Sequence, residues 1–247
     1  MGLIQPSYNI EEARKIHISQ GRPEKIAMQP NEASCIESYL KKDDVMFEYG
    51  SGWSTIHFSK FVDRFYSVEH NQEWSDIVNK QLKERNIFNT KLLTISQLPQ
   101  VDGWEDIYYD KYLDEKAKEL LRNYTPQCSV KGLHPHIGTI DDVREKNGKC
   151  YWICRGGSDW HQYIDYINSI ERAHDMLLST GKNKYKFDKV LVDGRCRVFC
   201  AYKALEFIDE NSIVFMHDFV YRPCYQTILK WYKVVEIIDT LVVLRRK

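Results

Sequence analysis

The sequence lacks a long hydrophobic run and an excess of charge of either sign. Its 247 residues include 35 basic and 35 acidic side chains, so the formal net charge is zero. A neutral chain without a basic run is not expected to bind nucleic acid non-specifically. No apolar run approaches the roughly 20 residues that span a membrane, and residues 1–6 carry neither a secretory signal nor a complete myristoylation signal. We therefore expect a soluble, cytoplasmic protein that binds neither membranes nor nucleic acid.

The sequence lacks a regular cysteine pattern, since its seven cysteines are an odd number and are scattered. Cys196 and Cys200 lie four apart on a predicted helix, which suits packing, so we expect reduced, buried thiols rather than a disulfide framework. A group of zinc-ligand residue types occurs between positions 128 and 154. The Cys-x3-Cys spacing on a predicted strand sets the two thiols too far apart for one ion, so buried cysteines and loop histidines are the preferred interpretation. This group comprises Cys128, His134, His136, Cys150 and Cys154.

The most informative segment is a short apolar run followed by two glycines. Residues 45–49 read as a buried strand, Gly50-Ser51-Gly52 as a tight turn, and the following residues as a helix that Ser54 or Thr55 could cap. Such a turn brings backbone N–H groups and a helix N-terminus up to a nucleotide. A second apolar run ends at Glu69, 19 residues after Gly50, where α/β nucleotide sites bind the ribose hydroxyls. A tight turn without a ligand is the alternative.

The identity of the nucleotide follows from the residues around the glycines. A dinucleotide fingerprint has a third small residue where this chain has Thr55, and it does not include Glu48. Acid-x-Gly-x-Gly resembles motif I of the class I S-adenosylmethionine-dependent methyltransferases. The resemblance implies that Glu48 lies near the methionine end of the cofactor and that Glu69 binds its ribose. The cofactor-binding residues are then predicted to be Glu48, Tyr49, Gly50, Ser51, Gly52, Ser54, Thr55, Glu69, His70, Asp193 and Gly194.

A fuller pattern narrows the resemblance. Residues 48–55, followed by residues 67–70 and Trp74, are similar to a branch that methylates sugars and polysaccharides. That branch includes plant glucuronoxylan methyltransferases and glycan-methylating enzymes of large algal viruses. The similarity covers residues 31–99 and 186–247 and implies a sugar or glycan substrate.

The remaining chain predicts a single α/β domain, residues 1–247, with the Rossmann-like methyltransferase fold. Further strands are expected at 91–95, 189–192 and 212–216, and helices at 31–40 (with Asn31 as a possible cap), 72–85, 160–178, 198–208 and 227–232. Residues 233–238 and 241–244 flank a two-residue turn and must be antiparallel, so the mostly parallel seven-stranded sheet ends in a hairpin. Residues 1–30 form an N-terminal extension. Residues 100–160, with a hairpin at Asn147-Gly148, form a large insertion before the fourth core strand that shapes the substrate site.

Polar residues at the tips of the fourth and fifth core strands are the catalytic candidates. These are Asp193, His217 and Asp218. In catechol-type methyltransferases, acids at these two tips hold a divalent ion, whereas this chain has His-Asp in place of Asp-Asn at the second tip. We expect both aspartates to face the acceptor and His217 to act as general base or as ligand to Mn²⁺ or Mg²⁺. A structural histidine and an Asx turn at Asp193 are the alternatives.

Three further residues are predicted to bind substrate: Arg195, Tyr221 and Arg222. Arg195 and Arg197 could clamp a hydroxyl-rich or acidic substrate or could cap the sheet edge. The predicted function is S-adenosylmethionine-dependent O-methylation of a sugar hydroxyl. A small-molecule or amine methyltransferase and a non-catalytic binding module remain as alternatives. Nucleic acid is not expected as the acceptor, because no Asn/Asp-Pro-Pro-aromatic signature follows a strand. The sequence gives no indication of oligomeric state.

Overall fold

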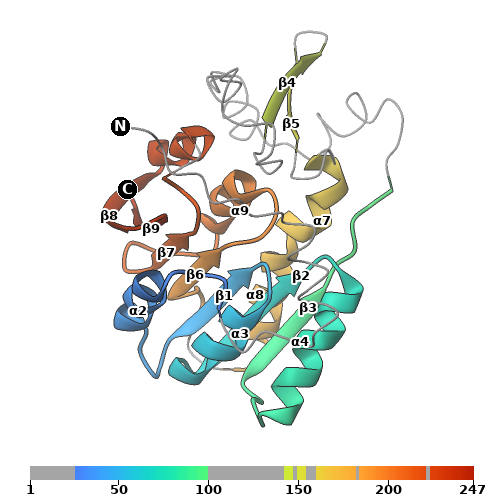
Figure 1. Ribbon diagram of the computed structural model, residues 1–247, viewed down its shortest axis with the longest axis vertical. Coiled ribbons are helices and arrows are strands. Elements are labelled where there is room, and N and C mark those ends of the chain that lie inside the picture. The colour runs from blue at the N-terminus through green and yellow to red at the C-terminus, as the bar shows by residue number, and fades with distance from the viewer. Residues whose placement is uncertain (1–25, 100–141, 147–148, 154–159, 182–183, 221–222) are drawn as a thin grey trace.

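The centre of the fold is a seven-stranded sheet. The computed structural model describes residues 26–99, 142–146, 149–153, 160–181, 184–220 and 223–247 (Figure 1). The strand order is β3-β2-β1-β6-β7-β9-β8. Strand β9 pairs antiparallel with its two neighbours, β7 and β8. The pairs β3–β2, β2–β1, β1–β6 and β6–β7 are all parallel. The predicted fold class is therefore confirmed. The strands are β1 (Val45–Tyr49), β2 (Arg64–Glu69), β3 (Thr90–Thr94), β6 (Lys189–Val192), β7 (Ile213–Met216), β8 (Tyr232–Ile238) and β9 (Leu241–Arg246).

Helices cover both faces of the sheet, which explains why its central strands are continuous apolar runs. On one face, Met46 and Phe215 pack with α2 (Pro30–Tyr39) and α3 (Trp53–Phe58), and α4 (Gln72–Glu84) packs beside α3. On the other face, Phe47 and Val190 pack in a larger core with α7 (Ile164–Ile167), α8 (Ser169–Leu178) and α9 (Arg197–Ala204). Short 3₁₀ segments complete the layers: η1 (Ser59–Phe61), η2 (Trp160–Tyr163) and η3 (Pro223–Lys230).

A separate antiparallel hairpin, β4 (Asp142–Lys146) with β5 (Lys149–Ile153), precedes the fourth core strand. This agrees with the hairpin predicted inside the insertion. The two turn residues, most of residues 100–160, and nearly all of the N-terminal extension lie outside the described residues. The same is true of Tyr221 and Arg222, and of the Cys/His group apart from Cys150, whose side chain is not described.

Several helix boundaries differ from those predicted. Helix α2 begins after Gln29, with Pro30 in the first turn, so Asn31 lies inside the helix instead of capping it. The long helix expected at 160–178 is divided into η2, α7 and α8, with Asn168 between the two α-helices. The helix expected at 227–232 is the 3₁₀ segment η3, and Tyr232 already belongs to β8. These segments are short, so tertiary packing decided their form more than helical periodicity did.

The cysteines also differ from the expectation. Cys35 and Cys200 form no disulfide, but Cys196 is disulfide-bonded. The expectation of uniformly reduced thiols is therefore wrong for Cys196, because sequence spacing does not show which cysteines meet in the fold. Within the described part of the chain, no helix combines the length and the apolar character needed to cross a membrane.

Candidate functional site

The candidate site lies at the carboxyl ends of the parallel strands, where β1 and β6 are neighbours. The chain leaves β1 towards β2 on one side of the sheet, while β6 continues to β7 on the other. This reversal is the topological switch point at which open α/β sheets bind ligands. The loop after β1 turns here, and its position is fixed because the N–H groups of Gly50 and Ser51 donate to the Val68 carbonyl oxygen at 3.0 and 3.1 Å.

Gly50 and Gly194 touch each other at this point. A Cβ on Gly50 would lie 2.6 Å from the Gly194 Cα, and a Cβ on Gly194 would lie 2.9 Å from the Gly50 nitrogen and 1.9 Å from the Tyr166 hydroxyl. Gly50 also has φ +94°, in the left-handed region that disfavours side chains. The protein's own backbone packing therefore requires glycine at both positions, whether or not a ligand binds.

Gly52 is different, because nothing inside the protein requires it. Its φ of 179° is extended, and a Cβ there would have no neighbour closer than 3.9 Å. The space above it is bounded by Trp74, whose indole Nε1–H donates to the Ser51 carbonyl oxygen at 2.8 Å. Ser51 is 7% exposed, yet its hydroxyl has no hydrogen-bond partner among the described residues. A glycine that the described packing does not require, next to such a buried hydroxyl, is what a loop that receives a ligand needs.

Glu48 and Tyr49 support this loop from below. Glu48 is fully buried and accepts hydrogen bonds from the hydroxyls of Ser54, Thr55 and Ser67. Burial raises the Glu48 pKa to about 7, although the three hydroxyls oppose the rise. Tyr49 is also fully buried, and its hydroxyl donates to the Ile167 carbonyl oxygen at 2.8 Å. The hydrogen bonds that the described residues give to both side chains therefore lie inside the protein.

The same region shows how α3 is capped. The helix begins after Gly52, and both Ser54 and Thr55 lie in its first turn. The Thr55 oxygen accepts from the N–H of Gly52, the N-cap residue, at 2.9 Å, so Thr55 takes part in capping as the sequence predicts. The Ser54 hydroxyl instead donates to the buried Glu48 carboxylate, to which the Thr55 hydroxyl also donates.

Glu69 stands at the tip of β2, as predicted. Its Oε1 accepts from the backbone N–H groups of His70 and Asn71, both at 2.9 Å, and from the His70 Nδ1 at 2.8 Å. Among the described residues, none contacts its Oε2. The other ring nitrogen of His70 accepts a long hydrogen bond, 3.4 Å, from the Arg195 Nε. Glu69, His70 and Arg195 therefore form a chain of contacts from the β2 tip to the loop after β6.

A second buried hydroxyl, that of Tyr166, borders the site. Tyr166 is 1% exposed and packs against Gly194 and the His70 ring, whose centroid lies 6.0 Å away. Burial raises the pKa of this phenol well above its usual value, so it stays protonated. Ser51 and Tyr166 therefore place two hydroxyls beside the Gly50–Gly194 contact.

The predicted catalytic residues lie together across the tips of β6 and β7. The Asp193 Oδ1 contacts the His217 Nδ1 at 2.9 Å, and the other ring nitrogen, Nε2, contacts the Glu32 Oε2 at 3.1 Å. Burial lowers the His217 pKa, but the Asp193 charge and the two hydrogen bonds outweigh it and raise the pKa to about 10. In this geometry His217 is a cation with both nitrogens donating. It therefore has no free nitrogen with which to act as a general base or metal ligand.

Glu32 anchors the far end of this arrangement. It is fully buried in α2 and accepts from the Gln29 N–H at 2.9 Å and from the N–H and hydroxyl of Thr240 at 2.8 and 2.6 Å. Burial raises its pKa, but these donors and His217 prevail and lower the pKa to about 2. Glu32 thus connects the N-terminal helix, the β8–β9 turn and the candidate site.

Arg197 connects the two aspartates. Its guanidinium contacts the Asp193 Oδ1 at 3.0 Å and the Asp218 Oδ2 at 3.1 Å. It also donates to the carbonyl oxygens of Gly194, His217 and Asp193 at 3.1, 2.6 and 3.2 Å. Arg197 is only 5% exposed. Of the two roles considered for it, the structure supports the internal one, because its nitrogens are turned to these oxygens and not to solvent.

The acidic groups could in principle hold a metal ion. Ligand atoms of Asp193, His217 and Asp218 lie within 4.8 Å of one another. However, one oxygen of each aspartate already contacts the Arg197 guanidinium, and both nitrogens of His217 face carboxylates. A divalent cation here would lie close to a guanidinium and an imidazolium. The donor set does not fit the predicted Mn²⁺ or Mg²⁺.

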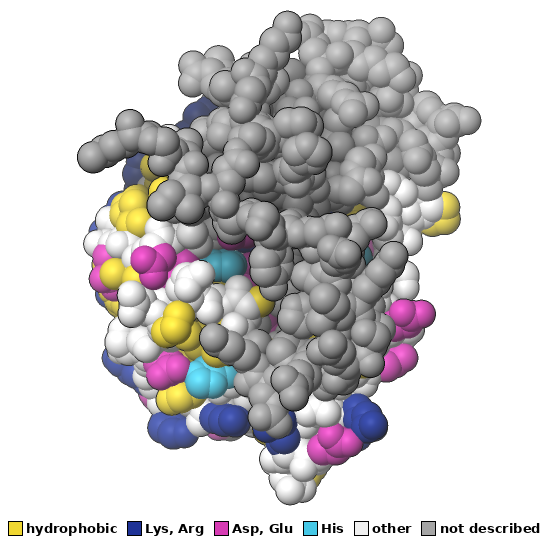
Figure 2. All heavy atoms as spheres, in the orientation of Figure 1, with side chains coloured by type: hydrophobic (Ala, Val, Ile, Leu, Met, Phe, Trp, Pro, Cys, Tyr) yellow, Lys and Arg dark blue, Asp and Glu magenta, His cyan; other side chains and the backbone are white. Residues whose placement is uncertain are grey.

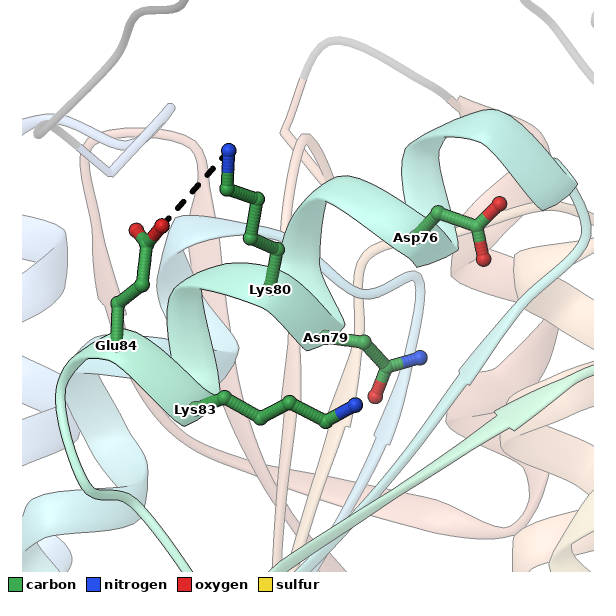
Figure 3. A pocket seen from close by; sticks show the side chains of 5 residues that line it. All are labelled: Asp76, Asn79, Lys80, Lys83 and Glu84. Atoms are coloured by element: carbon green, nitrogen blue, oxygen red, sulfur yellow. Dashed lines mark ion pairs between the residues drawn. The ribbon is translucent and has the colours of Figure 1, made fainter.

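Other surface features do not extend the site. A shallow hollow on α4 is lined by Asp76, Asn79, Lys80, Lys83 and Glu84, with Lys80 and Glu84 forming an ion pair at 3.8 Å (Figure 3). None of these residues is buried, and the hollow extends towards the end of α4 that is remote from Glu69. On the face shown in Figure 2, acidic and basic side chains of the described residues are interspersed. This matches the neutral composition.

The sequence matches no family model and no curated protein. Solved structures do match. A methyltransferase-like protein from Silicibacter pomeroyi is 20% identical over 92% of this chain and 90% of its own, with a TM-score of 0.57. A methyltransferase from Geobacter sulfurreducens is 8% identical over 99% of this chain and 93% of its own, with a TM-score of 0.48. At these identities the likeness concerns architecture. The chain has the Rossmann-like fold of the class I methyltransferases.

Proposed function

We propose that this protein is an S-adenosylmethionine-dependent methyltransferase that methylates a sugar hydroxyl of a glycan. The observation that carries the proposal is the loop at the switch point. There, the described structure has room for a side chain at Gly52 and does not require a glycine, and the adjacent Ser51 hydroxyl is buried without a hydrogen-bond partner among the described residues. Both features are explained by a ligand that approaches the backbone closely and supplies the missing hydrogen bond.

The residues around the loop fit the cofactor. The Ser51 hydroxyl can donate to the cofactor, and the Glu69 Oε2 is available to a ribose hydroxyl at the tip of β2. Trp74 would wall the space above Gly52. When bound, S-adenosylmethionine supplies an activated methyl group. Glu48, Tyr49, Ser54 and Thr55 support the loop from beneath, and we do not assign them cofactor contacts.

A hydroxyl acceptor must lose its proton, and Asp193 is the residue we assign to this step. Its Oδ1 is held by His217 and Arg197, whereas its Oδ2 has no partner among the described residues. The Asp193 side chain keeps 18% of its surface exposed, so an acceptor can reach it. The two cations fix the orientation of the carboxylate, and the Oδ2 accepts the hydroxyl proton. His217 then positions Asp193 and does not itself take the proton.

The sugar is supported by the resemblance of residues 48–55, 67–70 and Trp74 to glycan methyltransferases. We keep Arg195 as a candidate substrate contact, since it stands in the loop after β6 and reaches the His70 ring. Tyr221 and Arg222 follow Asp218 directly in the chain and remain candidates on that ground.

Calorimetric titration with S-adenosylhomocysteine tests the cofactor. We expect micromolar binding by the wild type and at least about ten-fold weaker binding by Gly52→Ala, because the new methyl group occupies the ligand's space. The matched control is Gly181→Ala, at a glycine with φ +67° and no atom within 4 Å of a Cβ, which should leave affinity unchanged. Absence of binding by the wild type, or equal binding by Gly52→Ala, contradicts the assignment.

A methyl-transfer assay with labelled S-adenosylmethionine tests the acceptor. Sugars and glycan fragments are compared with amines of similar size. We expect labelled O-methyl sugars, and a loss of about a hundred-fold or more in kcat for Asp193→Asn. Methyl transfer to amines alone would favour the alternative function, a small-molecule or amine methyltransferase. If Asp193→Asn kept normal turnover, another group would have to take the proton.

A further inference from the structure

Arg197 occupies the place that a cation would take between the tips of β6 and β7. Its guanidinium is surrounded by five oxygens: one carboxylate oxygen each from Asp193 and Asp218, and three backbone carbonyls. Carboxylate and carbonyl oxygens are also the ligands that hard metal ions prefer. The donor set of a metal site is therefore present, but it already binds a cation that belongs to the protein.

The arrangement is built from elements that approach from three directions. Asp193 follows β6, Asp218 follows β7 in a left-handed conformation with φ +58°, and Arg197 opens α9. Arg197 lies four residues after Asp193, so it folds back onto that carboxylate within its own loop and helix start. Because Arg197 is 5% exposed, water does not screen its contacts as it would on the surface.

We infer that Arg197 is a permanent internal cation that replaces a divalent metal ion at this site, so that the protein works without a metal. The guanidinium contacts one oxygen of each aspartate, so a divalent ion held between the two carboxylates would lie directly beside this fixed positive charge. As a positioning residue, Arg197 fixes the separation of the two strand tips and the orientation of Asp193. The claim about metal binding stands on this geometry alone; the claim about turnover also rests on the proposed methyl transfer.

The inference predicts that removing Arg197 uncovers a metal site. In Arg197→Gln the two aspartates lose their shared cation, and a divalent ion can take its place. We would titrate the full-length protein with Mn²⁺ and follow free Mn²⁺ by electron paramagnetic resonance, which needs neither substrate nor cofactor. We expect no saturable binding by the wild type below about 1 mM, and at least about ten-fold tighter binding by Arg197→Gln. Adding Asp218→Asn to that variant should abolish the gain.

Two results would overturn the inference. One is stoichiometric, micromolar Mn²⁺ binding by the wild type that Asp218→Asn removes, since this would show a working metal site despite Arg197. The other is a folded Arg197→Gln protein, checked by circular dichroism, that gains no affinity for Mn²⁺. If Arg197→Gln does not fold, the wild-type titration and Arg197→Lys decide. Lysine keeps the positive charge, so this variant should also bind no Mn²⁺, and micromolar binding by it would contradict the inference.

The catalytic claim has its own test. Wild-type methyl transfer should be unchanged, within about two-fold, by prolonged treatment with EDTA and by added Mn²⁺ or Mg²⁺. Loss of activity on chelation with recovery on addition of metal would overturn metal independence. Failure of the protein to bind S-adenosylhomocysteine would instead refute the proposed function and leave the metal titration interpretable.

Discussion

The replacement Glu32→Gln tests the buried charge pair on which the candidate site is built. Glu32 is fully buried and accepts four hydrogen bonds, from Gln29, His217 and two groups of Thr240. Glutamine can still accept from Thr240 through its carbonyl oxygen. Its amide nitrogen, however, would face the Gln29 N–H and the protonated His217 nitrogen. Because all three groups are hydrogen-bond donors, both of these hydrogen bonds would be lost.

The size of the effect follows from the Glu32 pKa. Lowering this pKa from 4.5 to about 2 corresponds to about 3 kcal/mol of preference for the charged carboxylate in the folded state. Losing two hydrogen bonds to a charged acceptor, at about 1.5 kcal/mol each, gives a similar figure. We therefore expect Glu32→Gln to lower the free energy of unfolding by about 3 kcal/mol at pH 6 and to lower Tm by about 6–12 °C for a chain of this length.

Urea denaturation at pH 6, followed by circular dichroism, measures this change. The matched control is Glu37→Gln in the same helix. Glu37 pairs with His57 at 2.5 Å, but both side chains are about one third exposed, so the loss should stay below about 1 kcal/mol. If Glu32→Gln cost less than 1 kcal/mol, or no more than the control, the buried pair would not hold the site together as argued.

Three further predictions concern stability. The Glu32–His217 pair stabilises the fold only within a range of pH. Folding lowers the Glu32 pKa from 4.5 to about 2, so the stability that this group contributes is lost as pH falls from 4.5 to 2. Folding raises the His217 pKa from 6.5 to about 10, so its contribution is lost as pH rises from 6.5 to 10. The difference in unfolding free energy between wild type and Glu32→Gln should therefore be largest between pH 4.5 and 6.5, and a difference independent of pH would contradict the assignment. The shift in the Glu48 pKa is opposite to that of Glu32, since burial raises the Glu48 pKa to about 7 and so disfavours its charged form. Glu48→Gln should therefore gain stability relative to wild type as pH rises from 4.5 to 7, and thermal melts across that range measure this change. Finally, Lys189→Met leaves the Asp44 carboxylate, whose side chain is 6% exposed, without its partner at 2.9 Å, and urea melts should show a loss of about 3–5 kcal/mol that Asp44→Asn in the same background partly restores.

The sequence predicted the fold because the fold depends on local patterns. Each core strand is a short apolar run, and each helix that covers the sheet has its own periodicity, so both could be recognised in isolation. The two-residue turn at Asp239 forced the antiparallel end of the sheet. The location of the strand tips could also be predicted from the sequence, since the carboxyl ends of parallel strands lie at one edge of the sheet. Asp193 and His217, 24 residues apart, could therefore be expected to meet.

The partners of the side chains could not be predicted in the same way. Glu32 contacts His217 across 185 residues of sequence, and no local signal in α2 marks that acid as buried. Its spacing of three residues from Gln29 suggested only an ordinary first helical turn. The sequence is compatible with two roles for Arg197, because the partners of this side chain depend on how α9 is set against two strands. Ser54 and Thr55 are both suitable residue types for a cap, and the sequence does not show that only Thr55 bonds the N-cap N–H while both hydroxyls donate to the buried Glu48 carboxylate.

The contact between Gly50 and Gly194 has a mechanical consequence. With no side chains between them, the loop that would receive the cofactor and the loop that carries Asp193 meet backbone to backbone, and neither can shift without moving the other. We therefore expect the two halves of the sheet on either side of the switch point to move together as one rigid unit. Distances between a group bound at Gly52 and an acceptor at Asp193 are then set when the protein folds, before either ligand arrives.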